Sequence, residues 1–138
     1  MDYKKSYVRA VLWCVILVVL TVAVNVLCLA LRNDENHFMM LLVNVLTDWL
    51  CGVFLVYFTS CHVQPKKELY RLSRRRREKI QGVIDRIEQQ SVRYERLNCV
   101  AVYIGQRQLF APVGLPLPKV GENAAFSVAG NVILEVAE

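Results

Sequence analysis

The sequence predicts a membrane protein of mixed α and β structure: a two-helix transmembrane hairpin, a long cytosolic juxtamembrane helix and a small C-terminal antiparallel β module. Hydrophobic residues make up 55% of the 138 residues and charged residues 21%, so the two kinds must be separated along the chain. Long uncharged stretches fill the first half, and after residue 98 the apolar pattern changes from a helical to an alternating period. The predicted domains are therefore 1–63, 64–97 and 98–138.

The first predicted span covers residues 10–31, which are 22 consecutive residues without a charge. At about 1.5 Å of helical rise per residue, they match the roughly 30 Å hydrocarbon core of a bilayer. A secretory signal peptide is the alternative, because Lys4, Lys5 and Arg9 resemble its basic n-region. Its apolar core is usually only about 7–15 residues long, so we expect this segment to remain as an anchor.

The second predicted span covers residues 38–60 and is interrupted only by Asp48. The short link at residues 32–37 makes the two spans a tight antiparallel hairpin. Three Lys and Arg residues precede the first span, one lies in the link, and eight lie between Lys66 and Lys79. Because basic residues stay on the cytoplasmic side, we expect a multi-pass protein of the cytoplasmic membrane with both termini in the cytoplasm.

Four polar residues form a predicted ladder inside the hairpin: Thr21, Asn25, Asn44 and Asp48. If the link is symmetric, Thr21 lies at the depth of Asp48, and Asn25 at the depth of Asn44. An ionised carboxylate at mid-bilayer costs at least about 2.5–3.5 kcal/mol, so Asp48 should not face lipid. The ladder either holds the hairpin or a homo-oligomer together, or it places Asp48 on an ion path lined by several copies.

A strongly basic segment follows the second span and predicts contact with anionic lipid headgroups. Its eight basic residues are Lys66, Lys67, Arg71, Arg74, Arg75, Arg76, Arg77 and Lys79. Nucleic-acid binding is the other class that such a segment suggests. We expect no nucleic-acid partner, because interleaved aromatic residues and a recognised motif are missing.

Apolar residues with a three-four spacing predict that the chain from 64 to 97 is one amphipathic helix. The stripe consists of Ile80, Val83, Ile87, Tyr94 and Leu97. Two interpretations follow, a coiled coil between copies in a homo-oligomer or a helix folded back on the C-terminal module of its own chain.

Residues 98–138 predict a small sheet of two hairpins. Residues 99–104 and 107–113 form the first, about Gly105-Gln106, and residues 124–129 and 132–136 form the second, about Gly130-Asn131. A proline-containing loop at 114–123 connects them. So small a sheet needs support from the preceding helix or from other copies, and it could receive a protein partner or a small ligand.

The sequence contains no catalytic constellation, and its five cysteines form no C-x-x-C pair. We therefore expect no enzyme, no cofactor and no metal site. The function that we expect is that of a non-enzymatic integral membrane protein, which anchors a cytosolic helix and β module for homo-oligomeric assembly or protein-protein interaction. The alternative is an oligomeric membrane effector or pore-forming protein gated by a ligand or partner at the cytosolic module, as in defence-type membrane disruption.

Overall fold

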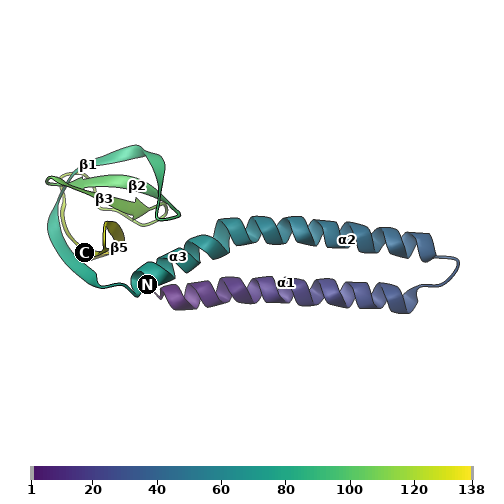
Figure 1. Cartoon of the computed structure of the whole chain (residues 1–138). Coiled ribbons are helices and arrows are strands. Elements are labelled where there is room, and N and C mark those ends of the chain that lie inside the picture. Colours follow the sequence, from purple (N-terminus) through teal and green to yellow (C-terminus); the bar gives the residue numbers. More distant parts are fainter. Residues whose placement is uncertain (1, 138) are drawn as a thin grey trace. The chain divides into compact units, whose positions relative to one another are not determined.

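The computed structural model describes residues 2–137 and divides the chain into two compact units (Figure 1). One unit is helical and runs from Lys4 to Lys66. The other contains the β structure, and comprises the chain from Lys67 onward together with Tyr3 at the other end of the sequence. The predicted class of mixed α and β structure with two long apolar helices is confirmed.

The helical unit is an antiparallel pair of helices, α1 (Tyr3–Leu31) and α2 (His37–Phe58), which lie side by side in all three overall views (Figure 1). The link between them is held by Asn33, whose Oδ1 atom accepts hydrogen bonds from the backbone N–H groups of Glu35 and Asn36 at 3.1 and 2.8 Å. Asn36 Nδ2 donates a further hydrogen bond of 3.1 Å to the Leu31 carbonyl at the end of α1, so this Asx turn makes the link compact.

A π-helical turn, η1 (Thr59–Val63), follows α2 and leads into the short helix α3 (Gln64–Ser73). The backbone N–H of Gln64 bonds to the carbonyl of Thr59, five residues earlier. Pro65 explains the wider turn, because a proline lacks the N–H and its ring would collide with the carbonyl of Cys61 in a regular helix.

By length and composition, two helices in the described chain could cross a membrane, Tyr3–Leu31 and the continuous helical stretch His37–Ser73. Few of their residues are fully buried: 6% of those in the most apolar part of the first helix and 0% of those in the second. Among the described residues, all but four of the exposed large apolar side chains lie on these two helices.

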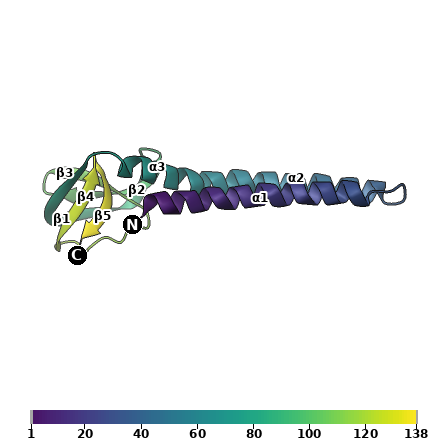
Figure 2. The same ribbon diagram turned by 90° about the horizontal axis from the view of Figure 1, so that it is seen from below.

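The β unit is a closed five-stranded barrel in the order β1-β2-β3-β5-β4 (Figure 2). Its strands are β1 (Arg77–Tyr94), β2 (Leu97–Ile104), β3 (Arg107–Pro112), β4 (Asn123–Ala129) and β5 (Val132–Ala137). All neighbouring strands are antiparallel except β3 and β5, which meet in parallel at Phe110 and Val132. The four strands predicted at 98–138 are present as β2 to β5. The prediction was wrong in two respects: β1 adds a fifth strand, and the parallel contact between β3 and β5 makes the sheet mixed rather than entirely antiparallel.

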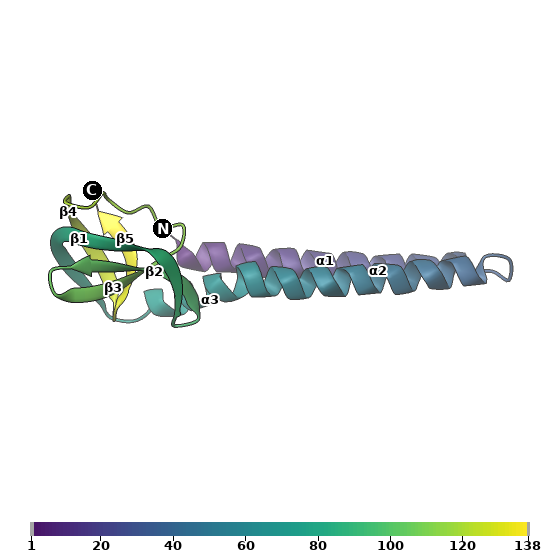
Figure 3. The same ribbon diagram turned by 90° about the horizontal axis from the view of Figure 1, so that it is seen from above.

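The long juxtamembrane helix predicted at 64–97 was also wrong beyond residue 73. The chain leaves α3 at Ser73 and becomes β1, the longest strand of the barrel (Figure 3). The segment after the arginines contains the β-branched residues Ile80, Val83, Ile84 and Ile87, which favour a pleated strand. The supposed coiled-coil stripe is thus strand surface: Ile80, Val83, Ile87 and Tyr94 lie on β1, and Leu97 begins β2.

A β-bulge explains why this strand imitates a helix. Ile80, Gly82 and Ile84 alternate with exposed residues, as expected of a strand with one buried face. The register then shifts between Ile84 and Arg86, which adds one residue on β1 and moves the next inward position to Ile87. The apolar inward residues Ile80, Ile84 and Ile87 are thus four and three residues apart, which is the spacing of an amphipathic helix, whereas Val83 of the predicted stripe faces outward.

Both predicted hairpins of the module are confirmed. β2 and β3 pair from Cys99↔Pro112 to Ile104↔Arg107, and β4 and β5 pair from Ala125↔Ala137 to Ala129↔Val132. The first residue of each two-residue turn is a glycine with positive φ, Gly105 at 62° and Gly130 at 64°. Glycine adopts this conformation without steric cost, which is why it marks the turn in the sequence.

The barrel unit has apolar clusters on both sides of its wall. The inner cluster fills the barrel and consists of Ile84, Val102, Ile104, Leu109, Ala111, Phe126, Val128 and Ile133. The outer cluster covers one side of the barrel and consists of Tyr3, Leu72, Leu97, Cys99, Ala129, Val132 and Leu134. Leu72 of α3 is 1% exposed, so α3 packs on the outside of the strands. The module is thus supported by its own chain.

A further bulge, between β4 and β5, lies where Tyr3 contacts Leu134. The register between β4 and β5 shifts at Ser127 and Val128, which places Leu134 opposite no residue of β4. A bulge of this kind leaves backbone groups without a ladder partner. The Tyr3 hydroxyl donates a hydrogen bond to the Leu134 carbonyl and satisfies it.

Candidate functional site

The helix α2 has two distinct faces. Half-buried residues recur every three or four positions and form the face that packs in the hairpin: Met40, Asn44, Thr47, Cys51, Leu55 and Phe58. The remaining residues between Leu41 and Tyr57 are exposed, Asp48 among them. Asp48 therefore lies at the margin of the packed face and is open to the surroundings of the hairpin.

The polar ladder is partly assembled, with a register different from the predicted one. Asn25 Nδ2 donates a hydrogen bond of 2.8 Å to Asp48 Oδ1, whereas the predicted partner of Asn25 was Asn44, one helical turn away. The observed pairing is therefore displaced by one turn of α2 from the predicted one. Thr21 bonds to the Leu17 carbonyl of its own helix at 2.9 Å and does not reach Asp48.

Asn44 is the fourth member of the ladder, and its Oδ1 atom is buried without a hydrogen-bond partner. A buried amide oxygen without a partner costs about 1–3 kcal/mol. Of the four predicted residues, the structure thus joins Asn25 and Asp48 directly, while Thr21 and Asn44 lie on the half-buried faces of their helices.

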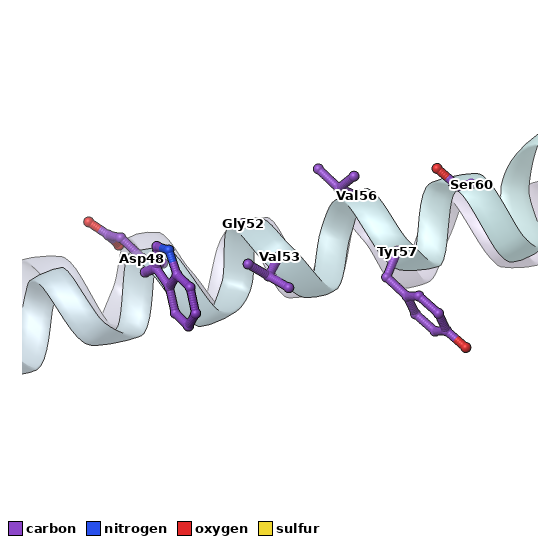
Figure 4. Close-up of a pocket in the computed structure, with 7 residues that line it drawn as sticks. Asp48, Gly52, Val53, Val56, Tyr57 and Ser60 are labelled. Atoms are coloured by element: carbon purple, nitrogen blue, oxygen red, sulfur yellow. The ribbon is translucent and has the colours of Figure 1, made fainter.

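An open groove of about 740 Å³ runs along α2 beside Asp48. It is lined by Asp48, Trp49, Gly52, Val53, Val56, Tyr57 and Ser60. Figure 4 shows Asp48, Val56 and Ser60 along one side of the helix, with Gly52 between them. This groove was missed from the sequence, although the four-residue spacing of Asp48, Gly52, Val56 and Ser60 carries its signal.

The structure divides the eight basic residues into two groups. Arg71 lies 2.8 Å from Glu68 and 3.4 Å from Glu95, Arg75 lies 3.9 Å from Glu95, and Arg77 lies 3.6 Å from Glu135. The others form no ion pair with any described residue: Lys66, Lys67, Arg74, Arg76 and Lys79. In this second group, no carboxylate of the described chain competes with an external anion.

The predicted packing stripe is placed on the barrel. Ile80 and Ile87 pack against the inner cluster, and Leu97 belongs to the outer cluster. Tyr94 stacks on Phe110 with ring centroids 4.1 Å apart. Val83 is 42% exposed. These residues hold the barrel together, which leaves only Val83 of the stripe available for contact with another chain.

A second groove, of about 660 Å³, lies on the outer face of the barrel. Arg77 and Lys79 of β1 border it, together with Ser127 of β4 and Glu135 of β5. The outward positions of β4 carry the small residues Ala125 and Ser127. The longer side chains of the neighbouring strands extend beyond these small residues and form the sides of the groove. Sequence reasoning missed this groove because its charged side chains come from strands far apart in the chain.

Among residues 2–137, no group of three or more His, Cys, Asp or Glu side chains is arranged to hold a metal ion. The five cysteines are all free thiols. Comparison with known proteins finds no family, curated protein or solved structure that matches the chain.

Proposed function

We propose that the chain is a non-enzymatic integral membrane protein, whose helical hairpin anchors the five-stranded barrel at the cytoplasmic face of the cell membrane and assembles with further copies of itself. The observation that carries the proposal is the exposed apolar surface of α1 and α2. Within the described chain almost nothing covers it. Apolar surface of this extent requires lipid or other protein, because exposure to water costs about 25 cal/mol per Å².

The flanking charges support the proposed orientation. The group of basic residues without ion pairs extends from Lys66 to Lys79 and follows the second helix closely. Attraction to anionic headgroups contributes about 1 kcal/mol per basic residue near the membrane surface. The cytoplasmic leaflet is therefore the partner that this segment suits.

Two measurements test this function. A reporter fused after the C-terminus should be active only in the cytoplasm, and the purified chain should require detergent and show the mass of an oligomer in it. A reporter active only outside the cell would contradict the orientation. A chain that stays dissolved without lipid or detergent would contradict membrane anchoring, and a monomeric mass in mild detergent would contradict self-assembly.

A second candidate function is an oligomeric membrane effector, gated by a ligand or partner bound to the barrel. One observation favours it: Tyr3, the first residue of α1, belongs to the outer cluster of the barrel unit. A molecule that displaces Tyr3 would therefore act directly on a residue of the helix.

A membrane-potential dye, used during induced expression of the native chain and of Asp48→Leu, tests this function. Depolarisation that disappears in the variant supports the effector, and an unchanged potential in the native chain contradicts it.

A further inference from the structure

We propose that the groove on α2 is the interface at which a second copy of this chain docks, helix against helix, with Asp48 and Gly52 at its centre. The inference rests on the proposed membrane-anchored assembly and names the surface through which it occurs. Three observations on the groove carry it.

The first observation is the position of Asp48. Its Oδ1 atom accepts the hydrogen bond from Asn25, yet the side chain is exposed, and the structure gives its Oδ2 atom no partner among the described residues. In a bilayer the surroundings of this part of α2 would be hydrocarbon, which stabilises neither a carboxylate nor the O–H of a carboxylic acid. The face that carries Asp48 therefore requires a polar protein group.

The second observation is the glycine one turn further along the same stripe. A Cβ atom built on Gly52 would meet nothing within 4 Å, so packing against α1 does not require glycine here. Glycine in a helix interior costs about 1 kcal/mol relative to alanine. The cost of this glycine is offset if another helix packs closely against it, because small residues allow two membrane helices to approach each other.

The third observation is the groove itself. Its volume of about 740 Å³ lies along more than three helical turns, from Asp48 to Ser60. Polar groups stand at both ends of the stripe in Figure 4, with Gly52 and Val56 between them. This is a surface shaped for a helix rather than for a compact ligand.

The occupant follows from the composition of the chain. Within residues 2–137, only the two helical stretches of the hairpin are long and apolar enough to reach this depth, and they already pack against each other. A third helix must come from another molecule, and a second copy offers the matching chemistry. An amide group carries two N–H donors, and Asn25 uses one of them for Asp48 Oδ1 of its own chain. Across a symmetric interface, Asn25 of each copy can therefore donate to Asp48 Oδ2 of the other.

The test compares the oligomer mass of full-length variants in mild detergent by light scattering. Gly52→Leu fills the groove and Asp48→Leu removes the polar contact, and each should reduce the native mass to that of a monomer. Asp48→Asn keeps a donor and an acceptor and should retain the oligomer. Val45→Leu adds bulk at an exposed position of α2 outside the groove and is the matched control.

Each outcome decides the proposal. Native mass in both Gly52→Leu and Asp48→Leu would overturn this interface while leaving self-assembly intact. A native chain that is already monomeric would overturn the proposed assembly itself. If Val45→Leu also dissociates the oligomer, the groove is not specific, and this interface is again overturned. Helical circular dichroism, together with energy transfer between differently labelled copies in liposomes, separates a lost interface from a misfolded hairpin.

Discussion

Cys99 lies on β2 and is the cysteine of the barrel, where its side chain is 0% exposed in the outer cluster. Burial raises the pKa of the Cys99 thiol to about 11, because a thiolate is poorly solvated among apolar side chains. The reactive form is the thiolate, so Cys99 is an inert, structural residue. Cys61, by contrast, is exposed.

The raised pKa predicts a loss of barrel stability at high pH. The unfolded thiol ionises near pH 9 and the folded one near pH 11, so its contribution is complete below pH 9 and is lost as the pH rises towards 11. The difference in pKa corresponds to about 3 kcal/mol. This contribution is measured by comparing the free energy of unfolding of the native chain with that of Cys99→Ala between pH 7 and 11. The native chain should lose more stability than the variant over this range. Equal losses would contradict the assignment.

Gly82 illustrates a different constraint at the residue scale. It occupies an inward position of β1, and a Cβ atom there would lie 2.7 Å from Cγ2 of Ile104. Ile104 belongs to the inner cluster, so the added atom would strain a packed core. The glycine makes room for a neighbouring strand rather than for a turn.

We expect Gly82→Ala to destabilise the barrel by about 1–3 kcal/mol, the usual cost of overpacking. Val83→Ala, at the adjacent position whose side chain is 42% exposed, should change stability by less than 1 kcal/mol. Chemical denaturation followed by tyrosine fluorescence compares the two variants. A neutral Gly82→Ala would show that Ile104 can move aside.

At the scale of elements, the turn between β1 and β2 is strained. Glu95 and Arg96 have positive φ values of 50° and 62°, a conformation that costs a non-glycine residue about 1–2 kcal/mol. Asn-Gly is the sequence usual in such two-residue turns. The strain is partly offset by ion pairs with α3, where Arg96 lies 3.8 Å from Glu68 and Glu95 lies 3.4 Å from Arg71.

Relief of this strain predicts a stabilising substitution. Arg96→Gly removes the steric cost and loses one ion pair, in which Arg96 is exposed and Glu68 is buried. Glu68 keeps Arg71 at 2.8 Å, so the lost pair contributes about 0–1 kcal/mol. We expect a net gain of about 1 kcal/mol and a higher melting temperature in differential scanning fluorimetry. Gln106→Gly, at a turn position without positive φ, is the control and should give no gain. A decrease in the melting temperature of Arg96→Gly would show that the Glu68 pair outweighs the strain.

At the scale of the whole molecule, Tyr3 ties the first residues of the chain to its last strand. Its side chain is 6% exposed, and its hydroxyl bonds to the carbonyl of Leu134, 131 positions away. The barrel unit is therefore completed by a residue that precedes it by more than sixty positions. A fragment that begins at Lys67 would lack it.

We expect Tyr3→Phe to lose about 1–3 kcal/mol, because the buried Leu134 carbonyl keeps no partner, and Tyr3→Ala to lose more through the cavity. Hydrogen exchange of full-length chains in detergent should show faster exchange along β5 in both variants. Val8→Ala on the same helix, at an exposed position outside the outer cluster, is the control. Unchanged exchange in Tyr3→Ala would contradict the role of Tyr3 as an anchor.

The sequence by itself determined the two apolar helices, their short link and both hairpins of the module, because these depend on local composition, periodicity and turn residues. It could not determine β1, since a bulge gives a strand the spacing of a helix and only pairing with β2 and β4 decides between them. It placed the four polar residues on the hairpin but not their register, which depends on how the two helices pack against each other. The sequence also did not predict that Tyr3 belongs to the outer cluster or that a groove lies on the barrel, because both features join residues that are distant in the chain. Such contacts depend on long-range packing, for which one sequence carries no local signal.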